Sequence, residues 1–293
     1  MRAVTLAASA VRRIPVTGPY RLDRTLSSGQ AFLWRWEGEA ATGIFAGWRV
    51  KLTQKRDGIR VEGLHDPDQV EALRRSLGVD EPLEAIEDGL RRDRVLRRVL
   101  PHTTGIALMR QDPWECLVGF VVSAFNNIPK IELTLDRLCR RFGKPVAGDG
   151  WLFPSPSALA AAKLRELRSC LLGYRAPYLA EVAKRVAARD FVLSEPAELP
   201  YGEARKLLLA LPGVGDKVAD CVLLFAYGKS EAFPVDVWVK RAVERWYFGG
   251  RVVTERRIRE FARQRFGVLA GYAQQHLFYH ARSARLDTFP HNG

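Results

Sequence analysis

Cysteine is scarce in this chain of 293 residues, which holds only four, at positions 116, 139, 170 and 221. They lie tens of residues apart, with no C-x-x-C pair and no neighbouring pair of histidines. A structural zinc site needs four such ligands at short spacing, so the pattern excludes one. We therefore expect reduced thiols in a cytosolic protein without a metal site.

Long hydrophobic runs are also missing. No stretch reaches the roughly 18 consecutive apolar residues of a membrane span, so we expect no membrane segment. Residues 3–11 are mildly apolar, but Thr5 and Ser9 interrupt them and Arg12-Arg13 follow, which makes a poor secretory signal. We expect a protein that is not secreted: cytoplasmic and nucleoid-associated in a bacterium, or nuclear in a eukaryote.

Acidic residues are outnumbered, with 33 Asp and Glu against 46 Lys and Arg, which gives a net charge of +13 and a pI near 9.9. The excess is spread along the chain, which favours a folded protein that binds a polyanion. Hydrophobic residues make up 47% of the chain and argue against disorder. A ribosomal or membrane-surface protein would share this charge, so composition alone leaves the polyanion open.

The pattern of the sequence changes near residue 64 from β-type to helical. Before it, short β-rich runs separated by turn signals predict an antiparallel sheet, at 31–36, 42–45, 49–53 and 59–62. After it, Asp66 can cap a helix through Leu77, and a second pattern runs from about 83 to 100. We predict an α+β protein with a small β-rich N-terminal domain over 1–105 and a mainly helical domain over 106–293.

The C-terminal part shows helical patterns almost to its end, and no strand is expected there. Loops with Gly and Pro separate the patterns, as at 143–153 and 194–200. The expected helices cover about 113–125, 130–142, 156–162, 163–172, 176–189, 202–210, 216–227, 237–248, 254–266 and 271–287.

A glycine-rich corner lies in residues 205–221, R-K-L-L-L-A-L-P-G-V-G-D-K-V-A-D-C. One helix is expected to end at Leu211-Pro212 and the next to begin at Asp216 or Lys217. The backbone N–H groups of Gly213, Val214 and Gly215 would then face a positive helix end, which seats anions such as DNA phosphate. Glycine at both positions permits unusual backbone angles and close approach. The alternative is an ordinary corner with a glycine C-cap.

Lys217 is unusual because a cation in the first helical turn opposes the helix dipole. It therefore either contacts phosphate or is shifted toward the free amine, which is a nucleophile. Cys221 follows one turn later on the same face. Asp236, in the apolar stretch Phe233-Pro-Val-Asp-Val-Trp238, is alternatively a plain N-cap.

The string L-P-G-V-G-D-K-V-A-D-C followed by P-V-D-V-W closely resembles the helix-hairpin-helix, Gly/Pro-Asp signature of DNA glycosylases. The version that carries the lysine resembles the 8-oxoguanine DNA glycosylase/AP lyase family. The similarity covers nearly the whole chain, including residues 28–34, 110–117, 126–128, 138–143 and 172–178.

This resemblance implies a base-excision enzyme that acts on double-stranded DNA with a damaged purine, as a monomer. Lys217 would attack C1′ and form a Schiff base, and Asp236 would stabilise the charge on the sugar. Cys221 and Phe278 would sandwich the flipped base, Gln274 would reach its pairing edge, and the Gly29 carbonyl would accept the N7 hydrogen. Alternatively, Gln274 and Phe278 are routine amphipathic residues and Gly29 is a turn glycine.

The resemblance also implies residues for the duplex. Tyr174 and Arg175 would wedge into the stack and contact the orphaned base, unless Tyr174 is a core aromatic. Three positions depart from well-known members: Phe125 replaces an asparagine, Lys130 an arginine, and Trp238 a histidine. Because lysine lacks the planar fork of arginine, we predict a weaker preference for cytosine opposite the lesion. The implied DNA contacts are Asn126, Asn127, Lys130, Tyr174, Arg175, Gly213, Val214, Gly215 and Trp238.

Two other functions stay open. One is a monofunctional alkylpurine glycosylase that activates water on the same scaffold, and the other is a DNA-binding module without catalysis. Relatives with an iron-sulfur cluster are excluded because their closely spaced cysteines are missing. No cofactor is required, although carbonyl groups at such hairpins are compatible with a monovalent cation.

Overall fold

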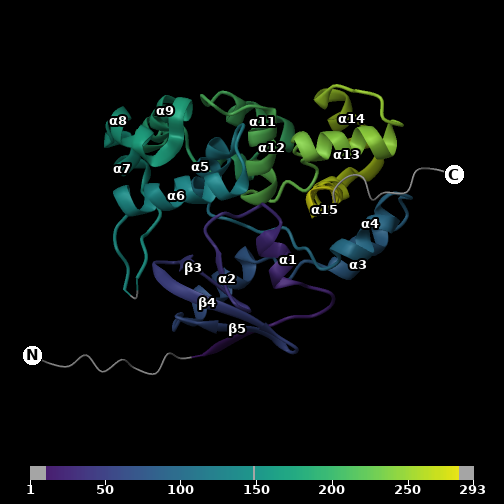
Figure 1. Cartoon of the computed structure of the whole chain (residues 1–293), viewed down its shortest axis with the longest axis horizontal. Helices are drawn as coiled ribbons and strands as arrows, with labels where there is room; N and C mark the ends of the chain where they lie inside the picture. The colour runs from purple at the N-terminus through teal and green to yellow at the C-terminus, as the bar shows by residue number, and fades with distance from the viewer. Residues whose placement is uncertain (1–10, 148, 284–293) are drawn as a thin grey trace, which may run out of the picture.

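A computed structural model describes residues 11–147 and 149–283 of the chain. It has the expected α+β fold, with an antiparallel sheet at the start of the chain and helices over the rest (Figure 1). The strand order is β1-β5-β4-β3-β2. The strands are β1 (Arg12–Pro15), β2 (Arg35–Glu37), β3 (Ala40–Phe45), β4 (Trp48–Lys55) and β5 (Gly58–Glu62).

The sheet forms because apolar side chains alternate along its central strands. Val50 and Leu52 on β4 and Ile59 and Val61 on β5 are fully buried, and β-branched residues dominate this face. The edge strand β1 was not expected, because Ile14 is its one buried residue among arginine and proline. Helix α1 (Leu22–Ser27) was not expected either, since six residues are too few for a helical period.

The expected N-cap at Asp66 is confirmed: its carboxylate accepts from the Asp68 N–H at 2.9 Å and begins α2 (Pro67–Ser76). The single helix expected over 83–100 is wrong. It divides into α3 (Leu83–Leu90) and α4 (Leu96–Thr103), because the buried carboxylate of Asp93 accepts from the backbone of Val95 and Leu96 at 2.9 and 3.0 Å.

The helical part follows the expected pattern, and its helices are α5 (Pro113–Ser123), α6 (Ile128–Phe142), α7 (Pro156–Ala161), α8 (Leu164–Leu167), α9 (Ala176–Ala187), α10 (Glu195–Glu198), α11 (Tyr201–Leu209), α12 (Asp216–Phe225), α13 (Val237–Tyr247), α14 (Glu255–Phe266) and α15 (Ala270–Ser283). The short α10 lies where only a loop was expected. Among the described residues after 112, the β-type pairing is an isolated bridge between Pro145 and Trp151. The expected end of the last helix at 287 lies outside the described residues.

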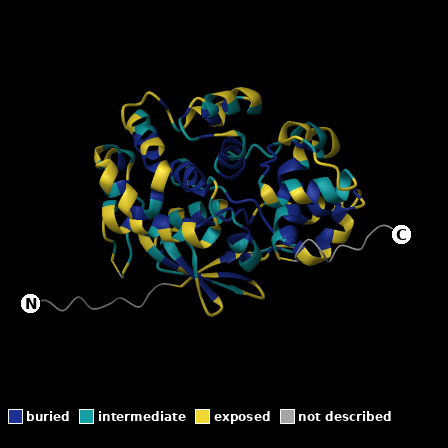
Figure 2. Ribbon diagram, turned by 45° about the horizontal axis from the view of Figure 1, so that its top comes forward, coloured by how far each residue is buried: buried dark blue, intermediate teal, exposed yellow. Residues whose placement is uncertain are grey.

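Helices α5 and α12 form the centre of the helical part and pack against each other. Both are buried over most of their length, and Val218 through Phe225 on α12, including Asp220, are all buried. Figure 2 shows buried residues in the interior helices and exposed residues on the outer faces. Polar side chains at the ends of these two helices therefore lie beside an apolar core.

Helix α15 joins the N-terminal part of the chain to the helical part. It packs against α4 and α13, and its buried His276 shares a hydrogen bond of 2.8 Å with Thr103. Because this helix carries residues of the candidate site, the site draws on both halves of the chain. The domain boundary between 105 and 106 stays a prediction. Across the two described segments, we find no helix with the length and apolarity needed to cross a membrane.

Candidate active site

The glycine-rich corner is a hairpin between α11 and α12. Gly213 has φ +77°, and a Cβ there would lie 2.8 Å from the Tyr178 Cβ, so this position requires glycine. Gly215 has φ −93°, which other residues adopt, and a Cβ there would meet nothing within 4 Å. The expectation of unusual angles at both glycines is therefore wrong for Gly215, whose role is to leave open space before the first turn of α12.

Arginine side chains neutralise the carboxylates around this helix start. Asp216 accepts from Arg205 at 2.6 Å and from Arg259 at 2.7 Å. The fully buried Asp220 accepts from Arg205 and from the Tyr201 hydroxyl, both at 2.8 Å. Without this pairing, two carboxylates would repel an anion at the hairpin, so the arginines preserve its positive potential.

Lys217 lies in the first turn of α12, as expected, and points toward the end of α5. Its Nζ donates to the Ser123 Oγ at 2.8 Å and lies 4.8 Å from the centroid of the Phe120 ring. The Ser123 hydroxyl in turn donates to the Phe120 carbonyl at 2.7 Å. The amine is thus held by a neutral hydroxyl and an aromatic face. No sequence pattern links Ser123 to a residue 94 positions away, and we did not identify it.

Only 3% of the surface of Cys221 is exposed, and its thiol lies within the electrostatic field of Lys217. Burial raises the pKa of its thiol to about 12, and the neighbouring Lys217 cation opposes that rise. The thiol is therefore neutral near pH 7 and presents a polarizable, uncharged surface beside the amine.

Asp236 is the N-cap of α13, and its Oδ1 accepts from the Val239 N–H at 2.8 Å. Burial raises the pKa of this carboxyl above its ordinary value, while the Val239 N–H and Lys217 partly offset the effect. The N-cap interpretation is thus confirmed, and the same carboxylate also lies within the electrostatic field of Lys217. The two interpretations are compatible.

The loop before the sheet meets one face of α15. Gly29 has φ +75°, and a Cβ there would lie 2.9 Å from Phe278 Cε1, so any other residue would collide with the ring. The Gln275 amide donates to the Ser28 carbonyl at 2.7 Å. Gln274 is buried, and its Oε1 finds no partner among the described residues. The structure therefore brings together Gly29, Gln274 and Phe278, which are far apart in sequence.

Arg282, one turn beyond Phe278, also belongs to this cluster, and we did not identify it from the sequence. Its Nη2 donates to the Ser27 carbonyl at 2.7 Å, and its guanidinium lies 5.4 Å from the centroid of the Phe278 ring. The i, i+4, i+8 spacing of 274, 278 and 282 was the signal that could have found it.

The turn after α5 carries the most exposed aromatic side chain of the described chain. Phe125 is 98% exposed and has φ +48°, a conformation that L-residues rarely adopt. Arg175 is buried beneath it and donates to the Ala124 carbonyl through Nε at 2.8 Å and to the Phe125 carbonyl through Nη2 at 3.0 Å. Tyr174 is 54% exposed, so the alternative that it is a core aromatic is wrong.

The remaining predicted DNA contacts lie near this turn or at helix starts. Asn127 caps α6 by accepting from the Lys130 N–H at 3.0 Å, and Asn126 donates to the Val122 carbonyl. Lys130 is exposed, and Trp238 is half-buried in the first turn of α13. Val214 is buried within the hairpin. Their contacts to DNA stay predictions.

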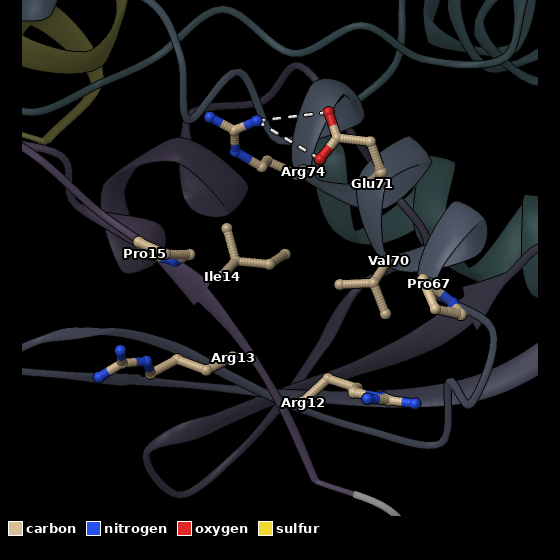
Figure 3. Close-up of a pocket in the computed structure, with 8 residues that line it drawn as sticks. All are labelled: Arg12, Arg13, Ile14, Pro15, Pro67, Val70, Glu71 and Arg74. Carbon is tan, nitrogen blue, oxygen red and sulfur yellow. Dashed lines mark hydrogen bonds and ion pairs between the residues drawn. The ribbon is translucent and has the colours of Figure 1, made fainter.

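A separate cavity of about 380 Å³ lies between β1 and α2 (Figure 3). Three arginines line it, but each has a partner: Arg12 the His65 carbonyl, Arg13 the Asp57 carboxylate, and Arg74 the carboxylate of Glu71. None of the candidate site residues lines this cavity. We also find no group of three or more His, Cys, Asp or Glu that could hold a metal ion within residues 11–147 and 149–283. A monovalent cation bound to backbone carbonyls stays a prediction.

Known proteins match this chain over most of its length. Residues 118–267 match the family model for the HhH-GPD superfamily of base excision DNA repair proteins. Residues 13–117 match the model for the N-terminal domain of 8-oxoguanine DNA glycosylase. The N-glycosylase/DNA lyase of Saccharomyces cerevisiae is 30% identical over 77% of this chain and 68% of its own.

Two further relatives cover almost the entire chain. The probable N-glycosylase/DNA lyase of Methanothermobacter thermautotrophicus is 31% identical over 94% of this chain and 97% of its own. The 8-oxoguanine glycosylase/lyase of Clostridium acetobutylicum, solved with double-stranded DNA that contains cytosine opposite 8-oxoguanine, has a TM-score of 0.86 and 31% identity over 90% of this chain and 92% of its own. This chain therefore belongs to the HhH-GPD superfamily of base excision DNA repair proteins and carries the N-terminal domain of the 8-oxoguanine DNA glycosylases.

Proposed function

We propose that this protein excises 8-oxoguanine from double-stranded DNA with Lys217 as the nucleophile and then cleaves the strand at the resulting site. The observation that carries the proposal is the position of the Lys217 amine, at the start of the hairpin's second helix, bonded to the neutral Ser123 hydroxyl. The hydroxyl fixes the position of the nitrogen without pairing it with a carboxylate, and a lysine amine is a nucleophile. The lyase and glycosylase names of the relatives support the same reaction.

The reaction uses the Lys217 amine as the nucleophile and the Asp236 carboxylate to stabilise charge. The Lys217 nitrogen forms a bond to C1′ while the bond from C1′ to the base breaks. The base leaves with the electron pair and takes up the proton that the nitrogen loses. The ionised carboxylate of Asp236 stabilises the positive charge that develops on the sugar. Opening of the sugar ring gives an imine, which permits β-elimination of the 3′ phosphate.

The damaged base is bound between Cys221 and Phe278, with Gln274 at its pairing edge and its N7 hydrogen donated to the Gly29 carbonyl. Guanine has an acceptor at N7 and would face the carbonyl acceptor without a hydrogen bond, which disfavours it. The burial of Gln274 with an unused Oε1, and the contact of Phe278 with Gly29, support this assignment. Residues 1–105 would close one side of this site, and 106–293 would supply the amine.

The duplex would lie across the hairpin and the Phe125 turn. Gly213 and Gly215 would bind a phosphate through backbone N–H groups, since the open space at Gly215 permits close approach. The Val214 N–H, which was expected to join them, donates to the Leu211 carbonyl at 3.2 Å and closes the turn instead. Phe125 and Tyr174 present aromatic side chains that can stack on bases exposed by flipping. Asn126, Asn127, Lys130 and Trp238 would surround the opposite base, with the protein acting as a monomer. Arg175 is buried and bonded to the Ala124 and Phe125 carbonyls, so it would support this surface from beneath.

Borohydride trapping on a duplex with 8-oxoguanine opposite cytosine tests the proposal. We expect a covalent complex with the wild type and none with Lys217→Gln. Release of the base without trapping in either protein would contradict the lysine mechanism and favour a glycosylase that activates water, with alkylated purines as the next substrates. Binding of the lesion duplex without any release would instead favour a non-catalytic module.

A further inference from the structure

Arg282 has one hydrogen-bond donor that the described protein leaves unused. Its Nη1 is out of contact with solvent and has no partner among the described residues, while Nη2 is bonded to the Ser27 carbonyl at 2.7 Å. A buried donor without an acceptor is unfavourable because it has lost its hydrogen bond to water, so folded proteins rarely retain one without a function. This guanidinium is thus fixed on one side and unsatisfied on the other.

The unused donor lies directly beside the base-binding residues. Nη1 would be 3.3 Å from a Cβ at Gly29, and the guanidinium lies against the Phe278 ring. Gln274, on the same face of α15, has a buried Oε1 that also lacks a partner. The helix α15 therefore presents an unused acceptor on Gln274, an aromatic ring on Phe278 and an unused donor on Arg282. A purine base can stack on the ring and has donors and acceptors on its edges for the other two groups.

The surrounding charges place Arg282 near the reacting groups as well. Burial lowers the pKa of its guanidinium, and Asp236 and Glu132 oppose that shift. Arg282 also helps to hold down the pKa of Asp236. A purely electrostatic role toward Asp236 would leave Nη1 without a use, whereas a contact to the substrate would satisfy it.

We propose that Arg282 is a specificity-determining residue that donates from Nη1 to an oxygen next to N7 of the flipped base. This inference rests on the proposed function, in which the N7 hydrogen points at the Gly29 carbonyl. The two oxygens that flank N7 in 8-oxoguanine are O6 and O8, and both are acceptors. Because Arg282 Nη1 lies beside Gly29, it faces this edge of the base. It would donate to one of the oxygens while the Gly29 carbonyl accepts the hydrogen on N7.

The test compares two substrates that differ only in the presence of the base. Single-turnover release of 8-oxoguanine opposite cytosine is measured beside strand cleavage at a preformed abasic site, for the wild type, Arg282→Met and Arg282→Lys. Arg282→Met keeps the apolar contact with Phe278 and removes the donor. We expect it to slow base release by about tenfold to a hundredfold, because the lost hydrogen bond has a charged donor.

For Arg282→Met, the loss in the rate of abasic-site cleavage should be at least tenfold smaller than the loss in the rate of base release, because the abasic substrate has no base oxygen. Arg282→Lys should recover little, since a compact ammonium cannot reach Ser27 and the base together. Arg24→Met is the matched control, because it removes another arginine that donates to a backbone carbonyl, that of Thr104, at 2.7 Å. Equal losses on both substrates, or no loss on either, would overturn the inference.

The two oxygens are separated with 8-oxoadenine, which keeps O8 and has an amino group in place of O6. If Arg282 contacts O8, Arg282→Met loses as much affinity for 8-oxoadenine as for 8-oxoguanine. If Arg282 contacts O6, Arg282→Met loses affinity for 8-oxoguanine but not for 8-oxoadenine, so its affinities for the two bases become more similar. Failure of the wild type to release 8-oxoguanine would instead contradict the proposed function, so the two failures are distinguishable.

Discussion

The two sides of the end of α5 differ in almost every physical respect. On one side Ser123 is buried and bonded to the Lys217 amine, among groups that are enclosed. Two residues later, Phe125 is almost fully exposed and has a left-handed backbone conformation. The enclosed side has the features needed to control protonation, and the exposed side has those needed to meet a large partner. One helix end would therefore hold the proposed chemistry and the proposed DNA surface at a fixed distance from each other.

Removal of the charge on Asp236 should have the largest effect on the enclosed side. Asp236→Asn keeps the cap on Val239 because asparagine caps helices as well as aspartate does. Single-turnover base release should fall by about a hundredfold to a thousandfold, as when a charge-stabilising group is lost from other active sites. Asp112→Asn is the matched control, since Asp112 caps α5 by accepting from the Trp114 and Glu115 N–H groups.

The pH dependence of the same pair has a definite sign. Burial raises the pKa of the Asp236 carboxyl in the folded protein, so folding favours its protonated form. The stability that this carboxyl contributes is therefore present in acid and is lost as the pH rises through its raised pKa. Asp236→Asn should thus melt at or above the wild-type temperature at neutral pH, with no such gain in acid. The acid limb of the wild-type rate profile should disappear in the variant. A variant that melts lower and retains the limb would contradict this assignment.

Loss of the Ser123 hydroxyl should have the next largest effect. Ser123→Ala removes the acceptor that holds the Lys217 amine, and a hydrogen bond to a charged group contributes about 1.5 to 3 kcal/mol. We expect base release and borohydride trapping to slow by about tenfold or more. Ser169→Ala is the control, because its hydroxyl donates to the Glu166 carbonyl at 2.6 Å with the same i−3 geometry and without a lysine. Equal effects of the two variants would exclude a positioning role for Ser123.

The sequence predicted the enclosed side well because its residues act through local motifs. The hairpin, Lys217 one turn before Cys221, and Asp236 at a helix start follow from helix caps and spacing within a few residues. Ser123 could not be predicted, because its partner is 94 positions away and serine is common at helix ends. The relation of Arg282 to Gly29 depends on how α15 packs against the N-terminal part. Tertiary contacts of this kind leave no period in the sequence.

The exposed side was predicted only in part, because exposure and backbone angle are not encoded in residue type alone. Phenylalanine is ordinarily buried, whereas Phe125 is 98% exposed and has a φ of +48°. That conformation is unfavourable by about 1 to 2 kcal/mol for an L-residue, and the hydrogen bonds from Arg175 to the Ala124 and Phe125 carbonyls stabilise it. Arg175 was expected to contact DNA directly, and in the structure its guanidinium supports this turn.

Truncation of the aromatic side chain tests whether the exposed side contacts the stack. Phe125→Ala should slow release from duplex DNA by about fivefold or more, since stacking of one base on an aromatic residue contributes about 1 to 3 kcal/mol. Phe125→Tyr should stay close to the wild type because the ring is retained. Trp48→Ala, on β4, removes another exposed aromatic and serves as the control. A loss with Phe125→Tyr as large as with Phe125→Ala would argue against stacking.

The smallest expected effect concerns the opposite base and tests whether the two sides are independent. Lys130 is exposed near the Phe125 turn and lacks the paired donors that arginine offers to a base edge. The wild type should therefore release 8-oxoguanine at comparable rates opposite C, A, G and T. Lys130→Arg should raise the preference for cytosine by about threefold, with the same amount of trapped complex at saturation. Lys51→Arg on β4 controls for the added guanidinium. Strict dependence on cytosine in the wild type would show that other residues read the opposite base, and a change in trapping would show that the exposed side controls the amine as well.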